Sequence, residues 1–292
     1  MDEQILAHLA GADAVLGGLI RAVGPCGLEA RSPCEPFQAL AQAIAHQQLH
    51  RSAANSILNR MIESCGKGAF PTPQMLLAAP VETLRAAGFS SAKVAALRDL
   101  AEKTVAAVVP DATQLLGLSD EEIIARLTQV RGIGRWTVEM LLIFGLGRAD
   151  VLPVDDFGVR AGFRAAYGLA RMPRPKALAA WGERWRPYRS TAAWYLWRAI
   201  ELKRAGTLPP PAERIRLPRL VRTRRRRPLR RRPQRSRVKS SSRRGARVRA
   251  AASPRRRLRS GDASSAPPRR SGARTRSRRR RAPRSRAPGS RR

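Results

Sequence analysis

The sequence is poor in cysteine, and its three cysteines, Cys26, Cys34 and Cys65, all lie in the first quarter of the chain. Their spacings of eight and thirty-one residues match no zinc or iron–sulfur ligand pattern. An odd cysteine count behind the acidic N-terminus Met1-Asp2-Glu3 also argues against the disulfide framework of a secreted protein. We therefore expect free thiols in a reducing compartment, a cytoplasmic, nucleoid-associated location and no cofactor.

Long apolar runs are also lacking. No stretch approaches the roughly 20 apolar residues that a membrane-spanning helix needs. The sequence therefore predicts no membrane partner.

Acidic residues are scarce, and most of the imbalance lies in one part of the chain. The whole sequence has 58 Lys and Arg against 21 Asp and Glu. From Ala205 to Arg292, 34 basic residues face 2 acids, which leaves 24 basic residues and 19 acids for residues 1–204. Residues beyond 213 are mainly Arg, Pro, Ser, Ala and Gly, too polar to bury a core. We expect a folded domain over 1–207 and a disordered basic tail over 208–292, beginning at Leu208-Pro209-Pro210-Pro211.

Two interpretations of this tail stay open. A basic tail attracts phosphates without regard to sequence, which would help a protein that scans DNA. The same residue types also arise when GC-rich DNA is translated in the wrong reading frame. Third-position base bias across codons 205–292 would distinguish a genuine tail from such an artefact.

The residues of the first part favour an all-α fold, because no segment alternates with period two for long enough to require a strand. Apolar residues recur at helical spacing, and Ser119 with Glu122 forms a capping-box pattern. The expected helices are 37–61 with a polar break at 46–50, 73–79, 80–86, 91–108, 119–130, 137–144 and 157–167.

The stretch Val130-Arg131-Gly132-Ile133-Gly134-Arg135-Trp136-Thr137 lies between two of these helices. Gly132 and Gly134 allow a tight turn and a close approach to phosphate, and Ile133 would anchor the turn in the core. Thr137 and the first amides of the next helix would then face a DNA phosphate. The alternative is an ordinary corner between helices that binds nothing.

Asp155 and Asp156 follow this stretch after a short interval. Either carboxylate suits the N-terminus of the helix expected at 157–167, so a capping role explains both on spacing alone. A carboxylate at a fixed distance beyond a phosphate-binding hairpin can also act chemically on the bound strand. Spacing does not choose between these roles.

Four segments in order resemble the helix–hairpin–helix DNA glycosylase superfamily, and within it the 3-methyladenine DNA glycosylase II type. They are Gln47-Gln48, Val130 to Thr137, Leu152 to Val159, and Arg184 to Ser190. The resemblance covers residues from about 36 to about 205 and implies a two-lobed helical domain. The family pattern of an Asp followed three residues later by a hydrophobic residue identifies Asp156 as catalytic, with Val159 as the hydrophobic member.

The resemblance also implies roles for other positions. Trp136 stands where relatives with lyase activity carry a Schiff-base lysine, so we expect a monofunctional hydrolase that leaves an abasic site. The implied base pocket contains Trp136, Met140, Phe157 and Trp197, while Trp181, Trp185 and Trp194 are expected in the core. Gln48 and Leu49 stand where the family inserts a wedge into the minor groove. The carbonyls of Thr128, Val130 and Ile133 are the implied ligands of a structural monovalent ion, and no catalytic metal is expected.

The sequence therefore favours base excision repair of alkylated purines such as 3-methyladenine, by a monomer acting on double-stranded DNA. One alternative is a glycosylase for oxidised or deaminated bases, which a pocket of aromatics without dedicated hydrogen-bonding groups would disfavour. Another is a DNA-binding protein without enzymatic activity, which has no need of a carboxylate such as Asp156 beside DNA.

Overall fold

The computed structural model describes residues 3–28, 35–213, 215 and 217, and within these residues the only regular elements are helices. In chain order they are α1 (Glu3–Ala12), α2 (Ala14–Val23), α3 (Pro36–His46), α4 (Arg51–Gly66), α5 (Pro73–Ala78), α6 (Val81–Ala87), α7 (Ser91–Val105), α8 (Ala112–Gly117), α9 (Asp120–Leu127), α10 (Arg135–Met140), the π-helix η1 (Leu141–Gly145), α11 (Phe157–Ala166), α12 (Pro175–Gly182), the 3-10 helix η2 (Glu183–Trp185) and α13 (Arg189–Ala205). The all-α prediction is confirmed for the described chain. None of the described helices is long and apolar enough to cross a membrane.

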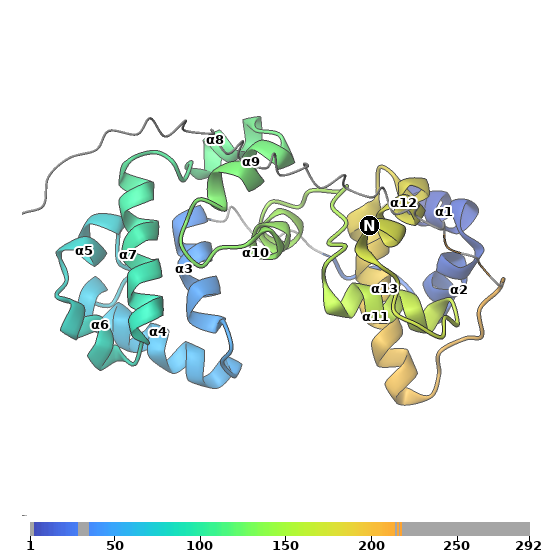
Figure 1. Ribbon diagram of the computed structural model, residues 1–292, viewed down its shortest axis with the longest axis horizontal. Helices are drawn as coiled ribbons and strands as arrows, with labels where there is room; N and C mark the ends of the chain where they lie inside the picture. Colours follow the sequence, from blue (N-terminus) through green and yellow to red (C-terminus); the bar gives the residue numbers. More distant parts are fainter. Residues whose placement is uncertain (1–2, 29–34, 214, 216, 218–292) are drawn as a thin grey trace, which may run out of the picture. The chain divides into compact units, whose positions relative to one another are not determined.

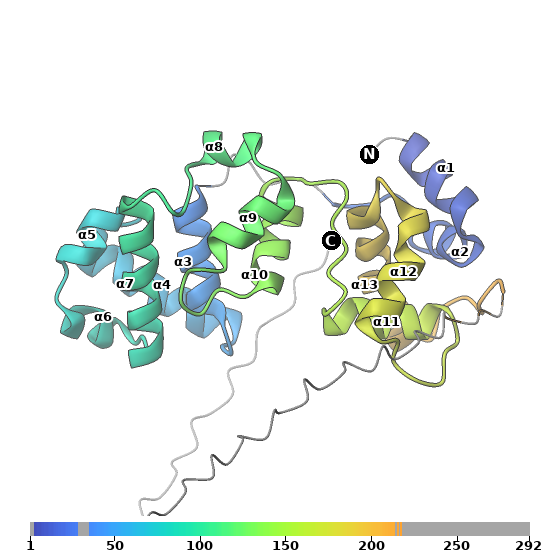
Figure 2. The same cartoon turned by 45° about the horizontal axis from the view of Figure 1, so that its top comes forward.

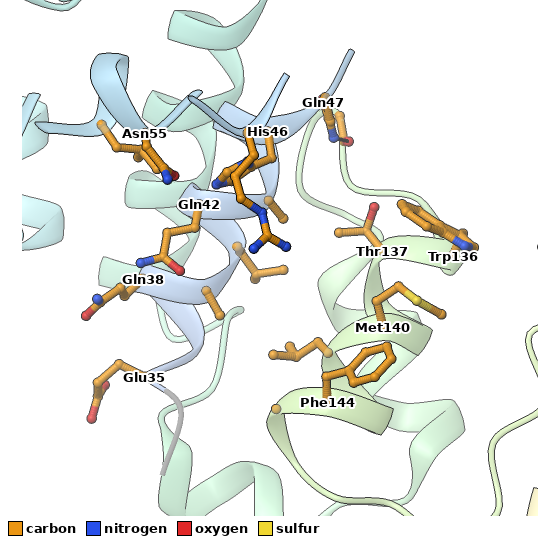
Figure 3. A pocket seen from close by; sticks show the side chains of 18 of the residues that line it. Glu35, Gln38, Gln42, His46, Gln47, Asn55, Trp136, Thr137, Met140 and Phe144 are labelled. Carbon is orange, nitrogen blue, oxygen red and sulfur yellow. Dashed lines mark hydrogen bonds between the residues drawn. The ribbon is translucent and has the colours of Figure 1, made fainter. Parts of the chain in front are cut away.

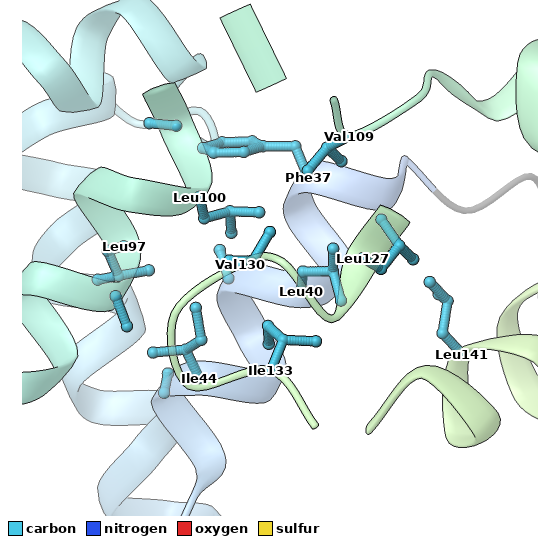
Figure 4. Close-up of a cluster of buried hydrophobic side chains, with 14 of the residues drawn as sticks. Phe37, Leu40, Ile44, Leu97, Leu100, Val109, Leu127, Val130, Ile133 and Leu141 are labelled. Carbon is cyan, nitrogen blue, oxygen red and sulfur yellow. The ribbon is translucent and has the colours of Figure 1, made fainter. Parts of the chain in front are cut away.

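Helices α3 to α10 pack around one hydrophobic cluster. Figure 4 shows how residues from distant segments meet there, with Leu40 and Ile44 of α3 beside Leu97 and Leu100 of α7. These four side chains are at most 1% exposed. Their burial fixes α3 against α7, and α3 leads directly into the loop that precedes α4.

A second hydrophobic cluster gathers helices from the two ends of the described chain. Helices α1 and α2 lie beside α11 to α13, as both views show (Figures 1 and 2). Helix α11 approaches α13 so closely that a Cβ at Gly162 would stand 1.8 Å from the Leu196 carbonyl oxygen. Two separate clusters agree with the expected two-lobed domain.

The buried carboxylate of Asp13 is the main polar feature of the second cluster. Asp13 is 3% exposed and caps α2 through the amides of Val15 and Leu16. Its Oδ2 atom accepts hydrogen bonds from three donors, the Tyr167 hydroxyl and the indole N–H groups of Trp181 and Trp185. Burial, followed by the charge of Asp13, raises the pKa of Tyr167 well above its ordinary value. Tyr167 therefore stays a hydrogen-bond donor.

The observed helix boundaries confirm some expectations and correct others. The polar break in 37–61 is real, because α3 ends at His46 and α4 begins at Arg51. The capping box at Ser119 and Glu122 is also present. The helix expected over 119–130 ends at Leu127, and the one expected over 91–108 ends at Val105. Residues 137–144 are not one α-helix, since α10 begins at Arg135 and gives way to η1. Helices α1 and α2 were not expected.

The basic tail expected over 208–292 lies almost entirely outside the described residues, and its predicted start at 208 stays a prediction. Cys26 and Cys65 are free and buried, and Cys34 lies outside the described part of the chain.

Candidate DNA-processing site

The hairpin, residues 128–134, joins α9 to α10. Gly132 has φ +80°, a conformation that L residues with a side chain rarely adopt. Gly134 has the ordinary φ of −98° and caps α10, and a Cβ there would meet nothing within 4 Å. Ile133 is 4% exposed and anchors the turn in the first cluster, as expected. The Thr137 amide donates to the Gly134 carbonyl, so it is already hydrogen-bonded within the first turn of α10. Backbone N–H groups that could meet an anion therefore precede Thr137 in the chain.

Two contacts from outside the hairpin hold its backbone in place. The Arg131 amide donates to Asp99 Oδ2 at 2.6 Å, and Gln47 Nε2 donates to the Gly132 carbonyl at 2.8 Å. Although burial acts to raise the pKa of Asp99, the hydrogen bonds from Arg131 and Lys103 outweigh it and lower that pKa. The hairpin is thus fixed from α7 on one side and from the loop after α3 on the other.

Arg135, the first residue of α10, forms ion pairs with neighbouring acidic side chains. Arg135 pairs with Glu121 of α9 at 2.9 Å and with Glu139 of α10 at 3.0 Å. Glu139 is 5% exposed, and burial raises the pKa of its carboxyl despite the opposing effect of Arg135. Arg135 therefore ties α9 to α10, and phosphate binding by the backbone amides at this turn stays a prediction.

The wedge loop, residues 47–50, lies next to the hairpin because Gln47 reaches the Gly132 carbonyl. Gln48 is exposed with φ 57°, and Leu49 is 40% exposed. Lys93 Nζ donates to the carbonyls of both Ala45 and Gln47 at 2.8 Å. Burial lowers the pKa of Lys93. The loop thus presents Gln48 and Leu49 from a fixed base, and their insertion into DNA stays a prediction.

The carboxylate of Asp156 lies where three donors converge. Oδ1 accepts from the Val159 amide at 2.7 Å, so Asp156 is the N-cap of α11. Oδ1 also accepts from Trp197 Nε1 at 2.9 Å, and Oδ2 accepts from Trp136 Nε1 at 2.7 Å. Asp155 is exposed and is not the cap of α11. The capping role and the candidate catalytic role therefore belong to the same residue, and Val159 supplies the capped amide.

Close packing on α11 and α13 keeps the Trp197 indole against this carboxylate. A Cβ at Gly158 would stand 2.8 Å from Trp197 Cδ1 and 3.1 Å from Asp156 Oδ1. On its other side, Trp197 stacks on Phe144, with ring centroids 5.6 Å apart. Sequence reasoning missed Gly158 and Phe144, although a glycine two residues after the key carboxylate was a usable signal.

A cavity of about 1110 Å³ opens between α3 and α4 on one side and α10 and η1 on the other (Figure 3). Trp136 and Met140, both expected in the base pocket, line it together with Phe144. Asp156 and Trp197 do not line it. Trp136 lines the cavity and donates to Asp156, which also accepts from Trp197.

Phe157, which was also expected in the pocket, does not line this cavity and is 74% exposed. The pocket roles of Phe157 and Trp197 therefore stay predictions. The expected absence of hydrogen-bonding groups does not hold for the cavity, because amide side chains line its α3 and α4 wall.

The remaining predicted positions fall into two groups. Trp181 and Trp185 are 8% and 0% exposed and belong to the second core, as expected, while Trp194 is partly buried under Arg198. In the implied cation site, the Val130 carbonyl accepts from the Ile133 amide at 3.0 Å, and cation binding by these residues and Thr128 stays a prediction. In the described ranges, no group of three or more His, Cys, Asp or Glu could hold a metal ion.

Comparisons with known proteins identify relatives of this chain. The family model of the HhH-GPD superfamily base excision DNA repair protein matches residues 41–187. DNA-3-methyladenine glycosylase 1 of Schizosaccharomyces pombe is 42% identical over 199 residues, covering 67% of this chain and 86% of the relative.

Two solved structures are similar along most of the folded part. One is the S. pombe 3-methyladenine DNA glycosylase in complex with abasic DNA, with a TM-score of 0.60 and 41% identity over 68% of this chain and 97% of that one. The other is a DNA-3-methyladenine glycosidase from Bacillus halodurans, with a TM-score of 0.64 and 34% identity over 70% of this chain and 92% of that one.

Proposed function

Because the chain belongs to the HhH-GPD superfamily of base excision DNA repair proteins, we propose that it is a monofunctional DNA glycosylase that removes alkylated purines. The substrate class is that of bases such as 3-methyladenine in double-stranded DNA, and the product is an abasic site. The observation that carries the proposal is the Asp156 carboxylate, held by indoles from α10 and α13.

The reaction needs the damaged nucleotide outside the duplex, because water cannot reach its glycosidic bond within the stack. Backbone amides at the start of α10 would hold a phosphate of the strand, since a helix N-terminus favours anions. Exposed Gln48 and Leu49 would fill the gap that the flipped base leaves. These two parts of the protein lie close together, because Gln47 of the wedge loop donates to the Gly132 carbonyl of the hairpin.

Bond cleavage gives the sugar oxocarbenium character, which a nearby carboxylate stabilises. Asp156 is suited to this task because its donors fix the direction of both oxygens before substrate arrives. Alkylation at N3 or N7 makes the purine cationic and weakens its bond, so no strong general acid is required. The cationic base also gains from the half-exposed face of Trp136.

The absence of strand cleavage is proposed from Trp136, the second residue of α10. A lyase forms a Schiff base between an amine and the sugar. Trp136 has no such amine, and its indole N–H is already donated to Asp156. The damaged base would therefore leave by hydrolysis alone, with the phosphodiester backbone intact.

The proposal is tested by incubating the full chain with methylated duplex DNA and separating the free bases by chromatography. The expected result is release of 3-methyladenine, with strand breaks appearing only after alkaline treatment. Borohydride trapping should give no covalent protein–DNA adduct. Intact base content would contradict the glycosylase assignment, and a trapped adduct would contradict hydrolysis without lyase activity.

A further inference from the structure

The wall of the cavity opposite Met140 and Phe144 is built from amide side chains. Gln38 and Gln42 lie one turn apart on α3, and Asn55 of α4 lies beside them at the same cavity (Figure 3). Residues four apart share one face of a helix, so the two glutamines form a short row along the wall.

These amides are not used to hold the protein together. In the described part of the chain, the side chains of Gln38, Gln42 and Asn55 form no hydrogen bond, whereas the nearby Gln47 side chain donates to the Gly132 carbonyl. Gln42 and Asn55 are exposed, and Gln38 is partly buried. Each amide therefore has two donors and an acceptor available to a ligand.

The opposite wall offers a different kind of contact. Met140 and Phe144 are partly buried against the first core and present apolar surface to the cavity. A ring with an apolar face and a polar edge suits this pair of walls. Its face would pack on Met140 and Phe144, and its edge would hydrogen-bond to the amide side chains opposite. Purine bases have this form. A glutamine or asparagine amide both donates and accepts, so it can pair with the N6–H and N7 edge of adenine or with the O6 and N1–H edge of hypoxanthine.

The cavity also adjoins the candidate catalytic carboxylate. Trp136 lines the cavity and donates its indole N–H to Asp156 Oδ2 at 2.7 Å. Trp136 is therefore the residue through which this cavity adjoins Asp156.

We propose that Gln38 and Gln42 read the hydrogen-bonding edge of the extruded base and set the preference between neutral and cationic purines. The inference rests on the proposed glycosylase function. A cationic alkylated purine is already activated and is attracted by aromatic faces, so it depends little on edge contacts. A neutral purine such as hypoxanthine lacks both advantages, and it depends on the amides for its binding and orientation.

The test compares the wild-type chain with the Gln38→Leu/Gln42→Leu double variant on two duplexes, one containing hypoxanthine and one containing methylated purines. Single-turnover rates of base release are measured for each. One neutral hydrogen bond corresponds to roughly a 3- to 10-fold effect. We expect hypoxanthine release to fall roughly 10- to 100-fold, with two bonds lost. Release of methylated purines should change less than about 3-fold, below the effect of one such bond.

Gln74→Leu is the matched control. Gln74 is an exposed glutamine on α5 that does not line the cavity, so both rates should stay at the wild-type values. Thermal unfolding of each variant shows whether the fold is kept, which we expect because neither cavity amide bonds to the protein.

The possible failures are distinguishable. Equal losses on both duplexes, or no loss on either, would contradict edge reading while leaving the proposed glycosylase function intact. The wild-type chain could also release methylated purines but no hypoxanthine. That result too would contradict edge reading and leave the proposed glycosylase function intact. A wild-type chain that releases neither kind of base would contradict the proposed function and, with it, this inference.

Discussion

Asp156 is the N-cap of α11 and also the candidate catalytic carboxylate, two roles that the sequence alone presents as alternatives. Its Oδ1 atom caps α11 through the Val159 amide and also accepts from the Trp197 indole, while Oδ2 accepts from Trp136. The cap orients the side chain, and the two indoles fix the direction of its oxygens. The family pattern named Asp156 in advance, but it did not reveal that Trp136 donates to it, because that contact joins residues twenty positions apart.

The two hairpin glycines are expected to respond differently to alanine substitution. Gly132→Ala forces a side chain into the left-handed conformation and should lower the free energy of unfolding by about 1 to 2 kcal/mol. Gly134→Ala should leave stability unchanged, because its φ is ordinary and its Cβ position is open. If that open space receives a DNA phosphate, Gly134→Ala should weaken DNA binding roughly tenfold, about 1.4 kcal/mol. Urea unfolding and fluorescence anisotropy measure the two effects, and unchanged DNA affinity would show that no phosphate approaches Gly134.

At the scale of elements, the sequence predicted most of the helices around the first core. Periodic apolar residues and the Ser119 capping box are local signals, and they suffice for α3, α4 and α9. The switch from α10 to η1 at Leu141 was not predictable in this way. The spacing of apolar residues over 137–144 carries no sign of the change.

The N-terminal helices were missed for a related reason. Helices α1 and α2 are ten residues each, and both bury their apolar residues against the second core. Short helices are marginal by themselves and depend on tertiary packing. Local sequence around Asp13 also gives no sign of its partners, because Asp13 bonds to residues more than 150 positions away.

Removal of the Asp13 carboxylate should therefore be costly. In Asp13→Ala, the hydroxyl of Tyr167 and the indoles of Trp181 and Trp185 lose a buried acceptor. We expect the free energy of unfolding to fall by at least about 3 kcal/mol, since each unpaired buried donor costs about 1 to 3 kcal/mol. Asp111→Ala, which removes an exposed cap of α8, is the control and should cost only about 1 kcal/mol. Equal losses in the two variants would rule out a special role for Asp13.

At the scale of the whole molecule, the candidate site depends on both cores. Trp197 packs against both clusters, and Asp156 joins its indole to that of Trp136 on α10. The hairpin packs into the first core and the wedge loop follows α3 of that core, while α11 and α13 belong to the second. The sequence indicated this arrangement only through the family resemblance. The order of four motifs along the chain does not give the distances between them in the folded protein.

The net charge proved a weaker guide than the placement of single residues. Of the 58 basic residues, 34 fall after residue 204, and all of these lie outside the described residues. Directly after the hairpin, Arg135 is paired with two glutamates. The DNA-binding proposal therefore depends on backbone amides and two exposed wedge residues more than on total charge.

The central claim, that the Asp156 carboxylate carries out the chemistry, is tested most directly by Asp156→Asn. Asparagine is also a good N-cap, and its one acceptor oxygen can keep both the Val159 amide and the Trp197 indole, so α11 should keep its start. The amide nitrogen cannot accept from Trp136, and the half-exposed Trp136 side chain can turn its indole N–H to water instead. The change removes the negative charge needed by the oxocarbenium-like sugar. Single-turnover release of 3-methyladenine is measured on methylated DNA, and affinity is measured on abasic-site DNA. The exposed neighbour variant, Asp155→Asn, serves as the control.

The account predicts that Asp156→Asn slows base release on the order of 10²- to 10³-fold, as expected when a charge-stabilising group is lost. Affinity for abasic-site DNA should stay within about 3-fold of wild type, less than the effect of one lost hydrogen bond to a charged group. Asp155→Asn should release base at the wild-type rate. Near-normal release by Asp156→Asn would contradict the account.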